Sequence, residues 1–138
     1  MANQTTIANY LSDGRPVLNL DTSKTLAITD CGIVQNVVKD GITITLPATV
    51  VGYSYSIRNA GAPKTGGAAG TGDDGSIAVT IAPNASDLIA GGTWTAADNK
   101  TIVNTKVTAK VGDELQIVAD GANGWMVTKQ IGIWAKTA

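Results

Sequence analysis

Residues 41–47 read GITITLP, and this stretch indicates the fold class. Its two isoleucines and its leucine alternate with two threonines, and Pro47 ends the run. Successive residues of a β-strand point to opposite faces of a sheet, so the stretch predicts a strand with one apolar face and one polar face. β-Branched residues such as Ile and Thr pack well on a pleated sheet, which favours the same interpretation.

The two-residue period recurs along the chain. It is clearest in YSYSIRN (53–59), SIAVTIAP (76–83), ELQIVADG (114–121) and GWMVTKQIGIW (124–134). In the last stretch the period places Trp125, Val127 and Lys129 on one face, opposite Met126 and Thr128. Weaker strands are predicted at Val17–Leu20, Leu26–Asp30, Ile33–Val38 and Thr101–Thr105.

About eight short strands, separated by clusters of Gly, Asn, Asp and Pro, predict an all-β protein. A set of this size favours a single β-sandwich of jelly-roll type, with a small barrel as the alternative. No window keeps apolar residues at helical spacing, so helices are not expected apart from one turn at Ser86–Ile89. No repeat in the sequence is regular enough to predict a solenoid.

Composition limits the chemistry of the chain. Its 138 residues suffice for one domain, and 15% of them are charged while 43% are hydrophobic. Histidine is absent, Glu114 is the only glutamate, and the net charge is −1. His-based triads and His-ligated metals are therefore excluded, and neither nucleic acid nor an anionic membrane is an expected partner. We expect a structural or binding domain, not an enzyme, and assign no catalytic, cofactor-binding or metal-ligating residue.

Neither the paired acids nor the glycine-rich stretch indicates a site. Asp113 and Glu114 are neighbours, so in a strand they point to opposite faces and cannot act on one substrate. Residues 59–75, NAGAPKTGGAAGTGDDG, lack the Gly-Lys-Ser/Thr ending of a phosphate-binding loop. They also lack the ligand spacing of a calcium loop, so this stretch is predicted to be an exposed loop.

The tryptophans allow two interpretations. Trp125 lies in an alternating strand and is expected in the core, whereas Trp94 and Trp134 are expected to cover edges of the sandwich or a subunit contact. If exposed, they would instead stack on sugar rings and make the chain a carbohydrate-binding module. Cys31 is the only cysteine, so it forms no intramolecular disulfide and is expected to be a small buried hydrophobe.

The first sixteen residues differ from the rest. Residues 1–16 are polar, with Ile7, Tyr10 and Leu11 as their large apolar groups, and they do not resemble a signal peptide. We expect an extended N-terminal arm at 1–16 and a β-sandwich domain at 17–138. No stretch approaches 18 consecutive apolar residues, so no transmembrane helix is predicted.

Residues 41–128 resemble a module in virion proteins of tailed bacteriophages. The resemblance rests on ITITLPATVVGYSYSIRNAG (42–61), IAVTIAPNASDLIAGG (77–92) and KTIVNTKVTAKVGDELQIVADGANGWMV (100–127). The positions that carry it are Thr45, Leu46, Pro47, Gly52, Tyr53, Asn59, Ile81, Pro83, Gly112, Asp113, Asp120, Gly121, Gly124 and Trp125. In this family, short stand-alone chains resemble head decoration (cement) proteins, and longer chains carry similar modules in tail fibres and spikes. In size, this short chain resembles the jelly-roll cement proteins of short-tailed phages.

The resemblance implies a structural role on the exterior of a virion. A cement protein is made in the cytoplasm of the host bacterium, binds the outer surface of the capsid and bridges neighbouring subunits of the major capsid protein. The alternative function is a receptor- or carbohydrate-binding module of a tail fibre, a spike or a head adhesin. No cofactor is expected in either case.

Two expectations about partners follow from the residues. Outer faces rich in Thr and Ala allow flat packing of one protomer on another, which favours a homodimer or homotrimer. The arm is expected to become ordered on the capsid or on a neighbouring protomer, with Ile7, Tyr10 and Leu11 as its anchors. Addition of a strand to a sheet edge is one way in which such an arm binds.

Overall fold

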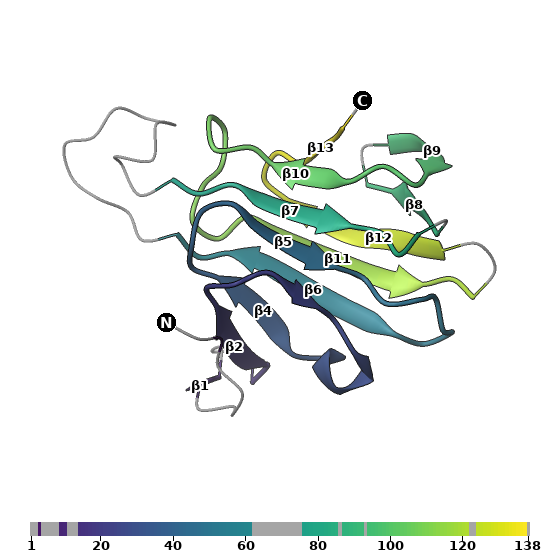
Figure 1. Ribbon diagram of the computed structural model, residues 1–138, viewed down its shortest axis with the longest axis horizontal. Helices are drawn as coiled ribbons and strands as arrows, with labels where there is room; N and C mark the ends of the chain where they lie inside the picture. Colours follow the sequence, from purple (N-terminus) through teal and green to yellow (C-terminus); the bar gives the residue numbers. More distant parts are fainter. Residues whose placement is uncertain are drawn as a thin grey trace.

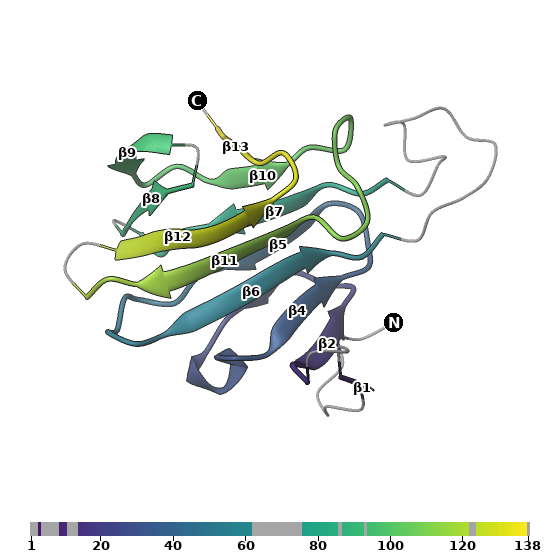
Figure 2. The same ribbon diagram turned by 180° about the vertical axis from the view of Figure 1, so that it is seen from behind.

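The structure is a computed structural model that describes residues 3, 9–10, 14–61, 76–85, 87–92, 94–121 and 124–137. Within them two β-sheets face one another (Figure 1, and from behind in Figure 2). Sheet A contains, in spatial order, β1 (Asn9–Tyr10), β2 (Pro16–Leu20), β4 (Val34–Val37), β6 (Ser54–Asn59), β11 (Glu114–Ala119), β12 (Gly124–Ile131), β8 (Leu88–Gly91) and β9 (Trp94–Asp98). Sheet B contains β13 (Ala135–Lys136), β10 (Ile102–Asn104), β7 (Val79–Ala82), β5 (Ile42–Thr45) and β3 (Lys24–Thr25).

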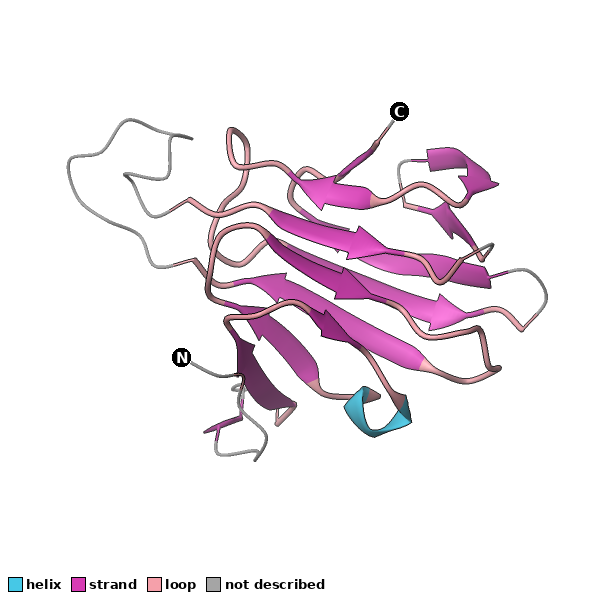
Figure 3. Cartoon of the chain, in the orientation of Figure 1, coloured by secondary structure: helices cyan, strands magenta, loops and turns pink. Residues whose placement is uncertain are grey.

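The predicted alternation is confirmed in the main strands. Ile42 and Ile44 face inward in β5, and Tyr55 and Ile57 face inward in β6. The apolar inner faces of the two sheets meet, as expected of a β-sandwich. The all-β prediction is thus confirmed. The one helical element among the described residues is the 3-10 turn Ile28–Asp30, cyan in Figure 3.

From β2 to β7 the chain crosses from one sheet to the other after each strand. As a result β2, β4 and β6 are parallel neighbours in sheet A, and β3, β5 and β7 are parallel neighbours in sheet B. The backbone makes successive coils, in which Leu20, Val37 and Asn59 occupy one level of sheet A. These equivalent residues of successive coils are 17 and 22 positions apart in the sequence. Because the two spacings differ, the coils leave no fixed repeat in the sequence.

This connectivity does not confirm the jelly-roll part of the prediction. Jelly rolls are built from antiparallel strands, whereas five of the strand pairings among the described residues are parallel. Antiparallel pairs predominate in the second half, where β11 lies between β6 and β12 and β10 lies between β7 and β13. The strands of the described residues also outnumber the eight expected. Three of the additional strands, β1, β3 and β13, are two residues long and too short for alternation to reveal, and the other two, β8 and β9, lie where no strand was predicted.

The strand predicted at Leu26–Asp30 is wrong. The chain forms strand β3 two residues earlier and then turns at Ile28–Asp30. The Asp30 carboxylate stabilises this turn, because it accepts hydrogen bonds from the backbone N–H of Ala27 (2.9 Å) and from Lys24 Nζ (2.6 Å). A short polar side chain that bonds to its own backbone favours a turn over an extended strand.

The helical turn expected at Ser86–Ile89 is also wrong, although Ser86 itself lies outside the described residues. Strand β8 begins at Leu88 and runs parallel to β12, with Leu88 registered to Gly124. Gly124 permits this close pairing, since a Cβ atom there would lie 2.0 Å from the Leu88 carbonyl oxygen. Strand pairing at long range thus outweighs the local preference of a short segment.

A β-bulge in β12 changes the face on which Lys129 lies. Ile117 is registered with Val127, but the preceding Gln116 is registered with Lys129, so Thr128 is an extra residue in β12. Beyond the bulge the alternation is reversed, and Lys129 lies on the outer face of sheet A. The predicted face of Lys129 is therefore wrong, because a two-residue period assumes an unbroken strand.

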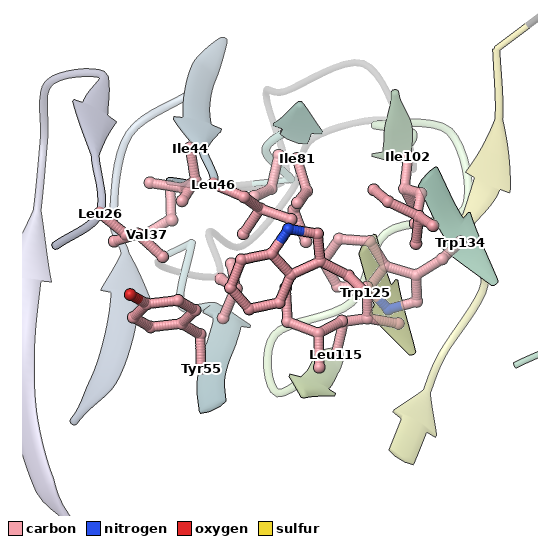
Figure 4. Close-up of a cluster of buried hydrophobic side chains, with 14 of the residues drawn as sticks. Leu26, Val37, Ile44, Leu46, Tyr55, Ile81, Ile102, Leu115, Trp125 and Trp134 are labelled. Carbon is pink, nitrogen blue, oxygen red and sulfur yellow. The ribbon is translucent and has the colours of Figure 1, made fainter. Parts of the chain in front are cut away.

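The core lies between the sheets and is centred on Trp125 (Figure 4). Trp125 is 1% exposed, and the centre of its ring system lies 5.5 Å from that of Tyr55. Figure 4 shows these two rings of sheet A beneath aliphatic side chains of sheet B, among them Ile44, Ile81 and Ile102. The central position of Trp125 confirms the prediction made for it.

Candidate functional site

Of the residues expected to contact a partner, Tyr10 is the one that the structure describes, and it lies at the edge of sheet A. Tyr10 lies in β1, is registered with Pro16 of β2 and is 67% exposed. Ile7 and Leu11 lie outside the described residues. Of the three, the structure therefore presents Tyr10 as a large apolar side chain at the end of the sheet. The glycine-rich stretch is described only as far as Gly61, and its residues 62–75 lie outside the description.

Trp134 does not offer a sugar-binding surface. It is 3% exposed, and its Nε1 donates a hydrogen bond to the carbonyl oxygen of Ile131 (2.9 Å). A buried indole presents no face for stacking on a sugar ring, so the alternative interpretation, in which Trp134 is exposed to bind a sugar, is wrong for this residue. The side chain of Trp94 lies outside the described residues, and its backbone belongs to β9.

Asn104, at the end of β10, connects several segments at one end of the sandwich. Its Oδ1 accepts a hydrogen bond from Asn59 Nδ2 (2.7 Å), and its Nδ2 donates to Asp113 Oδ2 (2.9 Å) and to the carbonyl oxygen of Ile133 (2.9 Å). Asp113 Oδ2 also accepts the backbone N–H of Lys110 (3.0 Å). We call Asn59, Asn104 and Asp113 the end cluster. All three are buried, and their mutual bonds offset the cost of removing polar groups from water.

The two neighbouring acids have different surroundings, as expected. Asp113 belongs to the end cluster, whereas Glu114 points to the outer face of sheet A, opposite in direction to Leu115. Gly132 makes room for Asp113, since a Cβ atom at Gly132 would lie 2.1 Å from Asp113 Cγ. The role of Asn104 was not predicted, because an asparagine near a strand end is equally typical of a turn.

A second polar group surrounds Glu114 on the outer face of sheet A. Glu114 is 3% exposed although it points outward. Its Oε1 accepts a hydrogen bond from Arg15 Nη1 (2.9 Å), and Lys129 Nζ lies 3.8 Å from its Oε2. Arg58 is registered with Glu114 across the pair of strands β6 and β11. We call Arg15, Arg58 and Lys129 the outer cations.

Arg58 also ends a ladder of side chains that crosses the parallel strands. Its Nε donates to Asn36 Oδ1 (2.9 Å), and Asn36 Nδ2 donates to Asn19 Oδ1 (2.8 Å). The three residues occupy registered positions on β6, β4 and β2. In-register parallel strands place such side chains beside one another, so the ladder is a consequence of the coiled connectivity.

The outer face of sheet B is different in character. Thr43 is registered with Thr80, which in turn is registered with Val103, and Thr45 is registered with Ala82. These five residues are uncharged and half-buried. The sandwich therefore has one outer face with charges and amides, and one that is neutral at its centre.

Cys31 is half-buried and packs against the core beside Tyr55. The Tyr55 hydroxyl donates a hydrogen bond to the carbonyl oxygen of Ala27 (2.9 Å). Burial raises the pKa of Tyr55 well above its usual range, and a hydrogen bond with Cys31 acts in the same direction. The arrangement holds Tyr55 in its neutral form.

We expect Tyr55 to make the fold less stable at alkaline pH. Above about pH 10 a tyrosine in the unfolded chain loses its proton while folded Tyr55 keeps it, so stability falls with rising pH. Tyr55→Phe removes this contribution, and the variant should lose less stability than the wild type between about pH 8 and pH 11. Urea unfolding midpoints at both pH values measure this. An equal loss in the two chains would contradict the assignment.

Within the described ranges, no three His, Cys, Asp or Glu side chains are grouped so that they could hold a metal ion. The described residues also contain no helix with the length and apolar character of a membrane span. No protein-family model, curated protein or solved structure matches the chain.

Proposed function

We propose that the chain is a structural virion protein that binds the outer surface of a phage capsid and stabilises it by bridging neighbouring major capsid subunits. The supporting observation is that large apolar side chains are exposed around the end cluster, whose own polar groups are buried and bonded to one another. Val107, Val111 and Ile133 lie in the loops that the cluster joins, and they are 78%, 54% and 59% exposed. Large apolar side chains exposed near one another are typical of protein contact surfaces.

The construction of the domain also suits a role in bridging. The two sheets share one core, and the end cluster ties the loops of β6, β10 and β11 to one another. A surface that is already ordered loses little conformational entropy on binding, and attachment at several points multiplies the affinity. Self-association as a homodimer or homotrimer would use the outer face of sheet B, because Thr43 and Thr80 can be buried without removing a charge from water.

Co-sedimentation with phage heads tests this proposal. We expect the wild-type chain to bind purified heads of its phage saturably, with a fixed number of copies per shell, and to remain bound in the presence of a chelator. Tyr10→Ala should weaken binding by about tenfold if the arm contacts the shell. Val51→Ala should leave binding unchanged, because this exposed residue precedes β6, whereas Asn59 of the end cluster is the last residue of that strand.

Two outcomes would contradict the proposal. The first is that wild-type chain fails to bind heads saturably. The second is that the chain binds a glycan array and not heads, which would favour the receptor- or carbohydrate-binding alternative. Equal binding by Tyr10→Ala and the wild type would contradict only the role of the arm.

A further inference from the structure

Cations gather on the outer face of five neighbouring strands of sheet A. Strands β2, β4, β6, β11 and β12 contain Arg58 and Lys129 but a single carboxylate, that of Glu114. Arg15 joins them from the position before β2. Among the described residues, three cations therefore lie around the carboxylate of Glu114, although the whole chain has a net charge of −1. Their grouping is a property of these strands and not of the composition.

Arg58 is held in place while part of its guanidinium group is left unused. The ladder fixes Nε through Asn36, which is itself bonded to Asn19. Neither Nη nitrogen of Arg58 makes a hydrogen bond to the described residues. A guanidinium fixed through Nε presents its two Nη groups as a planar fork that matches the two oxygens of a carboxylate. Because the ladder already orders the side chain, little further entropy is lost on binding.

The bulge in β12 adds Lys129 to the same face. In an unbroken strand Lys129 would share the inward face of Val127, whereas the bulge leaves its side chain 46% exposed beside Glu114. β-Bulges commonly redirect a side chain towards a functional surface. Glu114 holds Lys129 and Arg15 near one another in spite of their repulsion, so it acts as the anchor of the group.

We infer that the outer face of sheet A docks on an acidic protein surface, whose carboxylates bind Arg58 and Lys129. The inference deepens the proposed function and rests on it, since the partner surface would be the exterior of the shell. A polyanion is a poorer match. Proteins that bind nucleic acid commonly contact roughly six to ten phosphates, and basic clusters that bind membranes have roughly four to eight cations. Three cations on an acidic protein of pI about 5.1 suit a few carboxylates at fixed positions instead.

An NMR titration with a hexaglutamate peptide tests the face without a phage head. We expect chemical-shift changes concentrated in β6, β11 and β12, and weaker binding as NaCl is raised. Arg58→Glu should reduce the affinity by about tenfold or more. The matched control is Lys39→Glu, which makes the same change of charge in the exposed turn between β4 and β5 and should alter the affinity by less than about twofold.

Several results would overturn the inference. These are chemical-shift changes confined to sheet B, equal effects of the two charge reversals, or tighter binding of a DNA duplex or phosphatidylserine vesicles than of the peptide. Repulsion from Glu114 could unfold Arg58→Glu, so Arg58→Gln provides a second variant without added charge. It should bind the peptide more weakly than the wild type, and unchanged binding would contradict the role of Arg58.

Head binding separates this inference from the function on which it rests. If the wild type binds heads and both Arg58 variants bind them as tightly as Lys39→Glu does, the docking face is wrong and the capsid function stands. If the wild type binds hexaglutamate through this face but does not bind heads, the capsid function is wrong and the acid-binding face stands.

Discussion

We expect Trp125→Ala to lower the free energy of unfolding by about 3–5 kcal/mol. Trp125 is 1% exposed at the centre of the core and contacts the ring of Tyr55. Truncation to alanine removes a large apolar surface and leaves a cavity between two sheets that are held apart by their other side chains. Urea unfolding followed by circular dichroism measures the loss.

Two further variants control this experiment. Trp125→Phe should cost much less, because Trp125 Nε1 has no hydrogen-bond partner among the described residues and the substitution removes mainly volume. Met126→Ala, at the next position, should change stability by less than about 0.5 kcal/mol, since Met126 is 47% exposed on the other face of the strand. If Trp125→Ala were as stable as Met126→Ala, the arrangement of the core would be wrong.

The second large effect is expected at the end cluster. Asn104→Ala removes the groups that bond to Asn59, to Asp113 and to the carbonyl oxygen of Ile133. These partners remain buried, and a buried polar group without a hydrogen bond destabilises the fold, most strongly when it is charged, as a carboxylate is. We expect the free energy of unfolding to fall by about 3 kcal/mol.

Hydrogen exchange distinguishes this effect from a general loss of stability. Amide protons of the loop at 105–112 should exchange faster in Asn104→Ala, because the cluster no longer ties that loop to β6 and to the chain around Ile133. Asn99→Ala, in the exposed turn before β10, is the matched control and should leave both stability and exchange unchanged. Equal behaviour of the two variants would contradict the proposed role of the cluster.

The sequence predicted the faces of most strands but not the way in which the strands are connected. In β5, β6 and β11 the apolar residues of the alternating pattern face inward, as expected. Alternation depends only on the distance between neighbouring residues of one strand, so it carries no information on the direction of the next strand. For this reason the parallel coils of the first half were not predicted.

The candidate site was predicted in part. The opposite directions of Asp113 and Glu114 follow from their adjacency, and the structure agrees. The partners of Glu114 could not be predicted, because Arg15 is 99 residues away in the sequence. Lys129 was assigned to the wrong face, since a single bulged residue reverses the alternation without leaving a signal in the pattern.

By itself the sequence determined that the chain is all-β, which apolar residues of the main strands line the core, and that the neighbouring acids Asp113 and Glu114 point in different directions. These properties depend on residues a few positions apart, whose relative directions the backbone fixes locally. The tertiary structure alone decided that the strands coil in parallel and that Arg58 lies beside Glu114 and Asn36. Such neighbours are set by the register between strands, which depends on how the whole chain packs and not on any one segment.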